Sequence, residues 1–128
     1  MDIVTRNHID LLIQLAKVDQ NLCEKERKVI NRIAVANNFP QSEVELMIEN
    51  PRPMFSLGAL SINKKLDYII SLVELMLADE KILQSEMLFC TDIAIKLGFK
   101  KDVIDYLKTN VEFTPEEELK NSIREQYL

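Results

Sequence analysis

The chain has 128 residues, of which 47% are hydrophobic and 29% are charged, a balance typical of one globular domain and unlike a disordered chain. Sixteen basic residues against 21 acidic ones give a net charge of −5. Because this charge repels phosphate backbones and anionic lipid, it argues against a protein that binds nucleic acid or a membrane surface.

Targeting and cross-linking signals are absent from the sequence as given. The most apolar stretch, residues 68–78, is short and contains Glu74, so no membrane insertion is expected. The N-terminus lacks the basic flank and apolar core of a signal peptide, and two cysteines are too few for a disulfide framework. We therefore expect a cytoplasmic protein.

The first half of the chain, residues 5–50, is predicted to contain three helices. Apolar residues recur with helical spacing over residues 9–16 and again over residues 29–34, so each of these stretches predicts a helix with one buried face. A third, shorter helix is predicted from Ser42 to Glu49. The prolines of the next segment, residues 50–58, exclude helix there.

The second half repeats the first at an offset of sixty residues. A comparison of residues 9–46 with residues 69–106, without gaps, finds eight identical positions, which fall at helical core spacing and at turns. We therefore predict an all-α fold in which residues 5–50 and 62–110 form two pseudo-symmetric three-helix units of one domain, residues 1–128. The identical pairs are Ile9/Ile69, Leu12/Leu72, Leu15/Leu75, Asp19/Asp79, Glu26/Glu86, Ile33/Ile93, Ala34/Ala94 and Phe39/Phe99.

The second helix of each unit is predicted to end in a Schellman-type cap. Asn38 and Gly98 stand where the chain needs a residue in the left-handed conformation. Phe39 and Phe99 follow as the apolar residues that reach back to the alanine five positions earlier. The last short helix of the second unit is expected from Asp102 to Thr109.

A C-terminal helix, residues 115–127, has no counterpart in the first unit. Thr114 is the expected N-cap, and Leu119, Ile123 and Tyr127 form a narrow apolar stripe.

The second unit also has apolar residues that the first lacks. Leu77, Met87 and Leu88 replace Lys17, Arg27 and Lys28 of the first unit and lie off the internal stripe. We expect the C-terminal helix to cover this additional apolar face, and the alternative is that a protein partner binds it.

Two carboxylates recur at each helical hairpin. Asp19 continues the buried stripe of the first helix and Glu26 begins that of the second, and Asp79 and Glu86 repeat this arrangement. The two acids of each pair should therefore face each other across the mouth of the hairpin. Backbone N–H groups, a hard divalent cation such as Ca²⁺, Mg²⁺ or Mn²⁺, or a basic residue of a partner could offset their repulsion.

This arrangement differs from the common metal motifs. An EF-hand requires Gly at position six and a bidentate Glu at position twelve of its loop, whereas Ile30 or Cys90 stands at position twelve here. The sequence has one His and two Cys, which are not spaced as zinc ligands are, so it does not indicate a zinc site.

The hairpin loops, Leu15–Leu22 with Glu26 and Leu77–Ile82 with Glu86, resemble the TerB-like family of tellurite-resistance proteins. The similarity spans residues 5–110. It implies an all-helical fold of two pseudo-symmetric halves, a role in bacterial stress responses, and metal binding through Asp19, Glu26, Asp79 and Glu86. Gln20 and Glu80 replace the motif glycine, and Cys23 and Leu83 occupy the capping position, so the capping box is expected to be lost in both units.

Nothing in the sequence indicates an enzyme. His8 has no Ser, Cys or Asp at a sequence spacing that indicates a catalytic partner, and we expect it at the surface or at a helix cap. Two functions remain: a non-catalytic stress-associated domain, with a divalent metal at the paired acids, or a protein–protein interaction module or homodimer in which the acids are purely structural.

Overall fold

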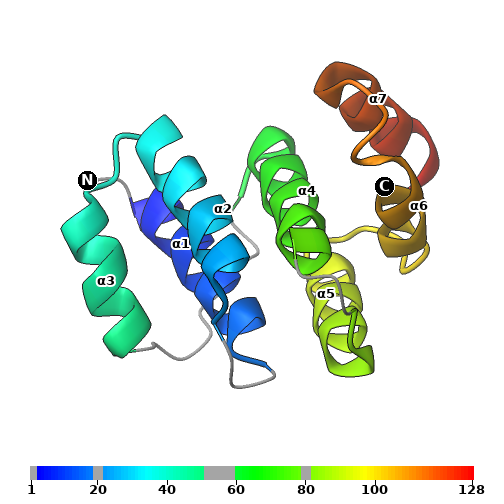
Figure 1. The fold of residues 1–128 in the computed structure, drawn as a ribbon. Helices are drawn as coiled ribbons and strands as arrows, with labels where there is room; N and C mark the ends of the chain where they lie inside the picture. Colours follow the sequence, from blue (N-terminus) through cyan, green and yellow to red (C-terminus); the bar gives the residue numbers. More distant parts are fainter. Residues whose placement is uncertain (1–2, 19–21, 51–59, 79–81) are drawn as a thin grey trace.

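The computed structural model describes residues 3–18, 22–50, 60–78 and 82–128. Within these residues the chain forms α-helices and no strand, which confirms the predicted all-α fold. Figure 1 shows the helices, which are α1 (Ile3–Ala16), α2 (Glu24–Ala36), α3 (Gln41–Glu49), α4 (Ile62–Ala78), α5 (Gln84–Lys96), α6 (Val103–Asn110) and α7 (Glu116–Gln126).

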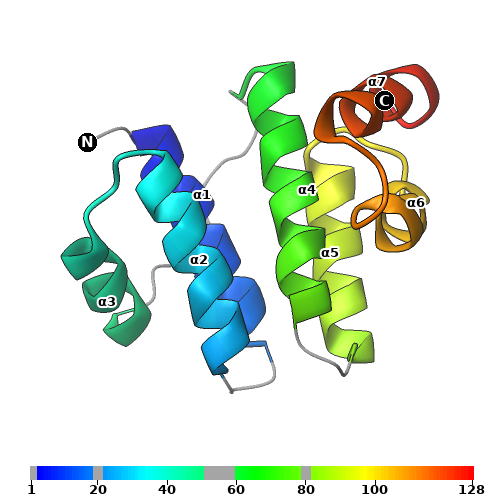
Figure 2. The same ribbon diagram turned by 45° about the horizontal axis from the view of Figure 1, so that its top comes forward.

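Two long helices, α1 and α4, pack against each other in the middle of the molecule (Figures 1 and 2). α3 packs on α1 and α2 at one end, and α6 packs on α4 and α5 at the other. α2 also contacts α4, and α5 contacts α1, so the two halves of the chain pack as one body. α7 packs on α6 at the end farthest from α3.

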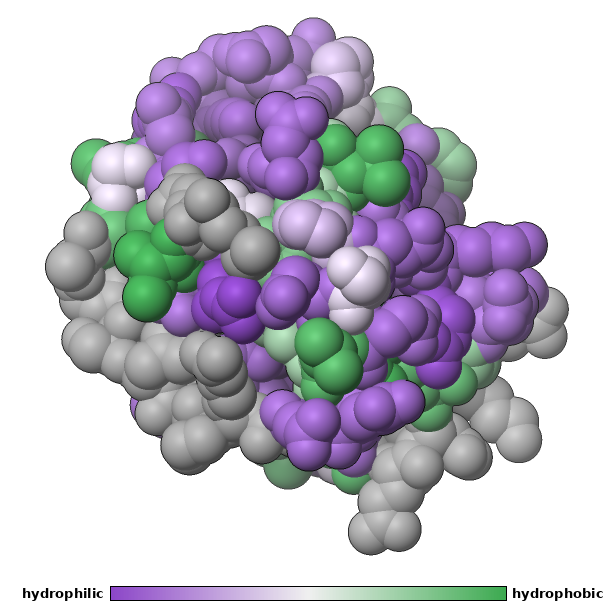
Figure 3. Space-filling model, turned by 90° about the vertical axis from the view of Figure 1, so that its left-hand side faces the viewer, coloured by the Kyte–Doolittle hydropathy of each residue, from purple (hydrophilic) through white to green (hydrophobic). Residues whose placement is uncertain are grey.

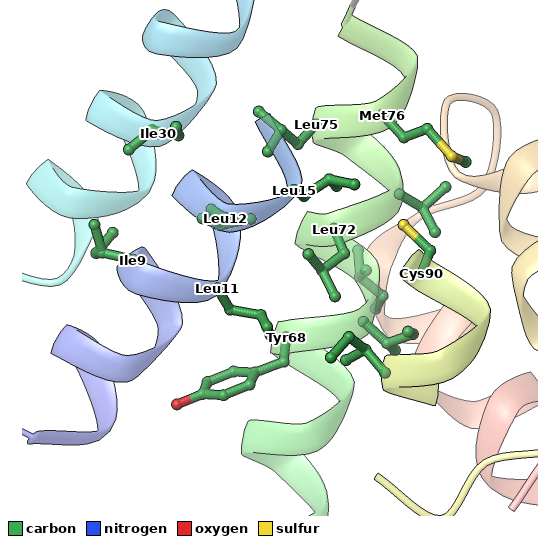
Figure 4. Close-up of a cluster of buried hydrophobic side chains, with 14 of the residues drawn as sticks. Ile9, Leu11, Leu12, Leu15, Ile30, Tyr68, Leu72, Leu75, Met76 and Cys90 are labelled. Atoms are coloured by element: carbon green, nitrogen blue, oxygen red, sulfur yellow. The ribbon is translucent and has the colours of Figure 1, made fainter. Parts of the chain in front are cut away.

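The core is continuous through α1 and α4. Figure 4 shows Leu11 and Leu15 of α1 directed toward α4, with Tyr68 of α4 directed toward α1. Leu11, at 0% exposure, lies off the predicted stripe of α1, because neighbouring helices cover more than one face of this helix. Burying one such side chain contributes about 1.5–3 kcal/mol, so this packing supplies much of the stability of the fold.

The predicted Schellman caps are confirmed at the ends of α2 and α5. Asn38 has φ 57° and Gly98 has φ 94°. The Phe39 N–H donates to the Ala34 carbonyl at 2.8 Å, and the Phe99 N–H donates to the Ala94 carbonyl at 2.9 Å. Both phenylalanines are 4% exposed, so each closes the core where its helix ends.

Gly98 offers a test of this cap. Gly98→Ala should lower the free energy of unfolding by about 1–2 kcal/mol, because an L-residue is strained at this positive φ. An added Cβ would meet no other atom within 4 Å, so backbone strain is the only expected cost. Gly98→Asn should cost less, since Asn38 adopts the same region in α2. Urea denaturation of the three proteins measures the difference, and equal stability of all three would contradict the strain argument.

α7 begins one residue later than expected. Its N-cap is Pro115, with ψ 145°, and its first residue is Glu116. The predicted stripe is nevertheless buried, with Leu119 at 2% and Ile123 at 0% exposure. Tyr127 packs on Tyr106 of α6 with ring centroids 5.1 Å apart.

The expectation that α7 covers the additional apolar face is wrong for Leu88, which is 62% exposed. α7 instead binds the first half of α4, where Lys120 forms an ion pair of 3.0 Å with Asp67 and Arg124 donates to Asn63. Leu77 and Met87 are partly buried against the core. They belong to the opposite end of the α4–α5 hairpin, which is out of reach of α7.

The surface is largely hydrophilic on the face shown in Figure 3, where the apolar residues form separate spots among polar ones. No helix in the described part of the chain is both long enough and apolar enough to span a bilayer.

Candidate functional site

The two predicted glutamates lie in the first turns of α2 and α5. Glu26 is the third residue of α2 and Glu86 is the third residue of α5, and both are 1% exposed. The Cys23 N–H donates to Glu26 Oε1 at 3.1 Å, and the Leu83 N–H donates to Glu86 Oε1 at 3.1 Å. Each carboxylate therefore reaches back over the first turn of its helix, where the helix dipole stabilises a negative charge.

The expectation that both capping boxes are lost is wrong for α2, and at α5 only one half of the box is lost. Cys23 Sγ accepts the Glu26 N–H at 3.5 Å, so a thiol takes the place of the usual hydroxyl and the first box is complete. The Leu83 side chain has no acceptor atom, and the second box keeps only the half that Glu86 supplies. Both glutamates therefore have a structural role, because each accepts a backbone N–H group at the start of its helix.

The aspartates of the predicted pairs, Asp19 and Asp79, lie outside the described residues. The predicted facing of Asp19 with Glu26 and of Asp79 with Glu86 therefore stays a prediction. Among the described residues alone, no group of three or more His, Cys, Asp or Glu side chains is arranged to hold a metal ion.

Neither thiol is activated. Burial, together with the nearby Glu86 carboxylate, raises the pKa of Cys90 to about 12. Desolvation raises the pKa of Cys23 above its usual value. Both thiols are protonated at neutral pH, and neither has the lowered pKa of a catalytic nucleophile.

A polar cluster that the sequence did not predict lies between the two halves. The His8 ring of α1 stacks on the Tyr68 ring of α4 with centroids 4.4 Å apart, and His8 Nε2 lies 2.5 Å from Ser71 Oγ. The Tyr68 hydroxyl donates to the Val4 carbonyl at 2.6 Å. These contacts join α1 to α4 through a ring stack and hydrogen bonds.

His8 is therefore not a surface or cap residue, as the sequence had suggested, because it is only 8% exposed. Burial lowers the pKa of its imidazole to about 4, and nearby Asp67 raises this value only in part. The ring is neutral at pH 7. The partner Ser71 is distant in sequence, and no periodicity in the first helix could have identified it.

Comparisons of the chain with protein-family models, curated proteins and solved structures found no match.

The residues of the alternative partner-binding surface are spread over two helices. Leu77 lies in the last turn of α4, where it lines a groove with Val29 and Val111, whereas Leu88 on α5 is exposed to solvent. Met87, like Leu77, is partly buried. Of these three described residues, only Leu88 presents a large apolar area to a partner.

Proposed function

We propose that this chain is a non-catalytic, stress-associated domain that binds a divalent cation at the mouth of each helical hairpin, as its resemblance to the TerB-like family implies. The observation that carries the proposal is the burial of Glu26 and Glu86, each 1% exposed and each the third residue of its helix. A buried carboxylate pays a large desolvation penalty, which a hard cation with oxygen ligands would offset.

The two hairpin mouths are proposed to be copies of one site, because the two halves are proposed to be pseudo-symmetric repeats. In support, α2 spans residues 24–36 and α5 spans residues 84–96, an offset of sixty residues. Exchanging the halves also maps the α1–α4 contact onto itself and each other helix contact within residues 3–110 onto a second one, for example α2 with α4 onto α5 with α1. In a solved structure, residues 9–46 should superpose on residues 69–106 in this register, and alignment in any other register would overturn it.

Titration of the protein with Ca²⁺ and with Mn²⁺, followed by NMR, tests the cation sites. We expect saturable shifts with Ca²⁺ and paramagnetic broadening with Mn²⁺ at the Cys23 and Leu83 amides. Glu26→Gln and Glu86→Gln keep an oxygen that accepts the capping N–H but remove the charge. Each variant should weaken binding at its own hairpin by about tenfold or more, while the fold is retained.

Glu24→Gln is the matched control, because Glu24 is an exposed acid in the same first turn as Glu26. It should leave the titration unchanged. Asp79→Asn should abolish binding in the second hairpin alone. If the metal titration is unchanged by Glu26→Gln, Glu86→Gln and Asp79→Asn, the metal proposal is contradicted. The acids then have a purely structural role.

One observation favours the alternative of a protein–protein interaction module or homodimer. Leu88 is 62% exposed on the second unit, where the first has Lys28. Light scattering gives the oligomeric state of the wild type and of the Leu88→Lys variant. A wild-type dimer that this substitution dissociates would support self-association through α5. A monomer in both cases would exclude it.

A further inference from the structure

A groove of about 250 Å³ lies at the C-terminal end of α4, where this helix approaches α2 and the end of α6. It contains none of the four acids of the hairpin mouths, so it is separate from the proposed cation sites. Its lining consists of four aliphatic residues and two acids, which are Val29, Leu77, Ala78, Val111, Glu74 and Glu112.

The lining has acids but no basic residue, and only one of the acids is neutralised nearby. Glu74 pairs with Arg32 at 2.5 Å. Glu112 is exposed and forms no ion pair with any residue that the structure describes, although Lys108 precedes it by four positions. α4 has no basic residue in its last turn, where the helix dipole favours a cation. The groove therefore combines an aliphatic wall with one uncompensated negative charge, which is complementary to an ammonium group on an alkyl stem.

The first half of the chain shows how such a position can be filled. Lys17 stands sixty positions before Leu77 and is its counterpart in the proposed repeat. The Lys17 ammonium donates to the carbonyl of Ile48, in the last turn of α3. α6 is the counterpart of α3, and the Leu77 side chain has no donor to offer it. The first half thus supplies its own alkylammonium at the position where the second half has a groove.

An exposed aromatic residue follows the groove in the chain. Phe113 comes directly after Glu112 and is 83% exposed. Aromatic side chains are enriched at protein–protein interfaces, where they contribute much of the binding energy. A small free amine is too short to fill the groove and also cover this ring, whereas a polypeptide can do both. The ring therefore favours a lysine of a partner protein over a free amine.

We propose that this groove binds a lysine side chain of a partner protein, next to an apolar residue of the same partner. The ammonium would pair with Glu112, the aliphatic stem would lie on Leu77 and Val29, and the apolar neighbour would cover Phe113. Such a contact would serve the alternative of a protein–protein interaction module, and it requires no metal at the hairpin mouths.

Three probes test the proposal, each followed by the NMR amide signals of the groove residues. They are the capped tripeptide Leu-Lys-Leu, its analogue with norleucine in place of lysine, which lacks only the ammonium, and n-butylammonium, which is the lysine side chain alone. We expect the lysine peptide to bind with a Kd on the order of millimolar. The other two probes should bind at least about tenfold more weakly, because each lacks part of the contact.

Substitutions separate a specific contact from general attraction to an acidic protein. Glu112→Gln should weaken binding of the lysine peptide by about threefold or more. Glu118→Gln removes the same charge from an exposed acid of α7 and should leave binding unchanged. Leu77→Lys should place the chain's own ammonium in the groove, as Lys17 does in the first half, and weaken binding by about tenfold or more. Val35→Lys adds the same charge at an exposed position of α2 outside the lining, and should have no effect.

Phe113→Ser distinguishes a partner protein from a free amine, because it should weaken binding of the lysine peptide and not of n-butylammonium. Circular dichroism verifies that each variant keeps its helices. Equal binding of the lysine and norleucine peptides, or unchanged binding in both Glu112→Gln and Leu77→Lys, would overturn the proposal. Binding of n-butylammonium as tight as that of the lysine peptide would also overturn it, with a free amine as the occupant. All of these titrations are made without a metal ion, so their outcome does not depend on the cation sites.

Discussion

Replacing Leu72 by Ala is expected to lower the free energy of unfolding by about 3–5 kcal/mol. Leu72 is 0% exposed on α4, within the core that unites both halves of the chain. The substitution removes three buried carbon atoms and leaves a void that helices packed on several sides cannot fill by moving. Because a domain of this size is stable by only about 5–15 kcal/mol, the loss is a large part of the total.

Urea denaturation measures this loss as a lower midpoint with an unchanged slope. Leu88→Ala on α5 removes the same atoms from a side chain that is 62% exposed, and should change the free energy of unfolding by less than about 0.5 kcal/mol. If the two substitutions had equal effects, the core would not lie between α1 and α4 as described.

Acidification should destabilise the protein through His8. Its pKa falls from 6.5 in the unfolded chain to about 4 in the native protein, so the unfolded state binds the proton first. The free energy of unfolding therefore declines as the pH falls from about 6.5 toward 4, by about 2–3 kcal/mol. The charges nearest the ring are Asp67, which favours its protonation, and Lys64, which opposes it.

Carboxylates also titrate in this range, so a comparison with His8→Gln is needed. The Gln side chain can form a hydrogen bond with Ser71 Oγ in place of the imidazole, but it has no charge to gain. The difference in stability between the wild type and this variant, followed by urea denaturation from pH 7 to pH 4, isolates the histidine. Parallel pH profiles would contradict the assignment of a buried, neutral His8.

Local rules of sequence explain the parts of the fold that were predicted. Asn38 and Gly98, each followed by a buried Phe, predicted where α2 and α5 end, because few residues adopt positive φ. The stripe of Leu119 and Ile123 predicted the buried face of α7. These signals lie within one or two helical turns and need no knowledge of the neighbouring helices.

What could not be predicted depends on contacts between distant segments. A stripe of period 3.6 identifies one buried face, but α1 is covered on more sides than one, and so Leu11 and His8 are buried as well. The pairing of His8 with Ser71 joins residues 63 positions apart. α7 also forms an ion pair between Lys120 and Asp67 of α4, a contact that an apolar stripe does not specify.

The stacked pair of His8 and Tyr68 has a consequence for how such a chain can diverge. The two rings occupy positions sixty residues apart, so in the proposed two-fold arrangement both lie at the symmetry axis. In an assembly of two separate identical subunits, an axial residue must meet its own copy. Joining the halves in one polypeptide removes that constraint, and each side of the axis can then mutate by itself. An imidazole that faces a phenol, with Ser71 on one side and Leu11 at the matching position on the other, is a pairing that two identical subunits could not form across their axis.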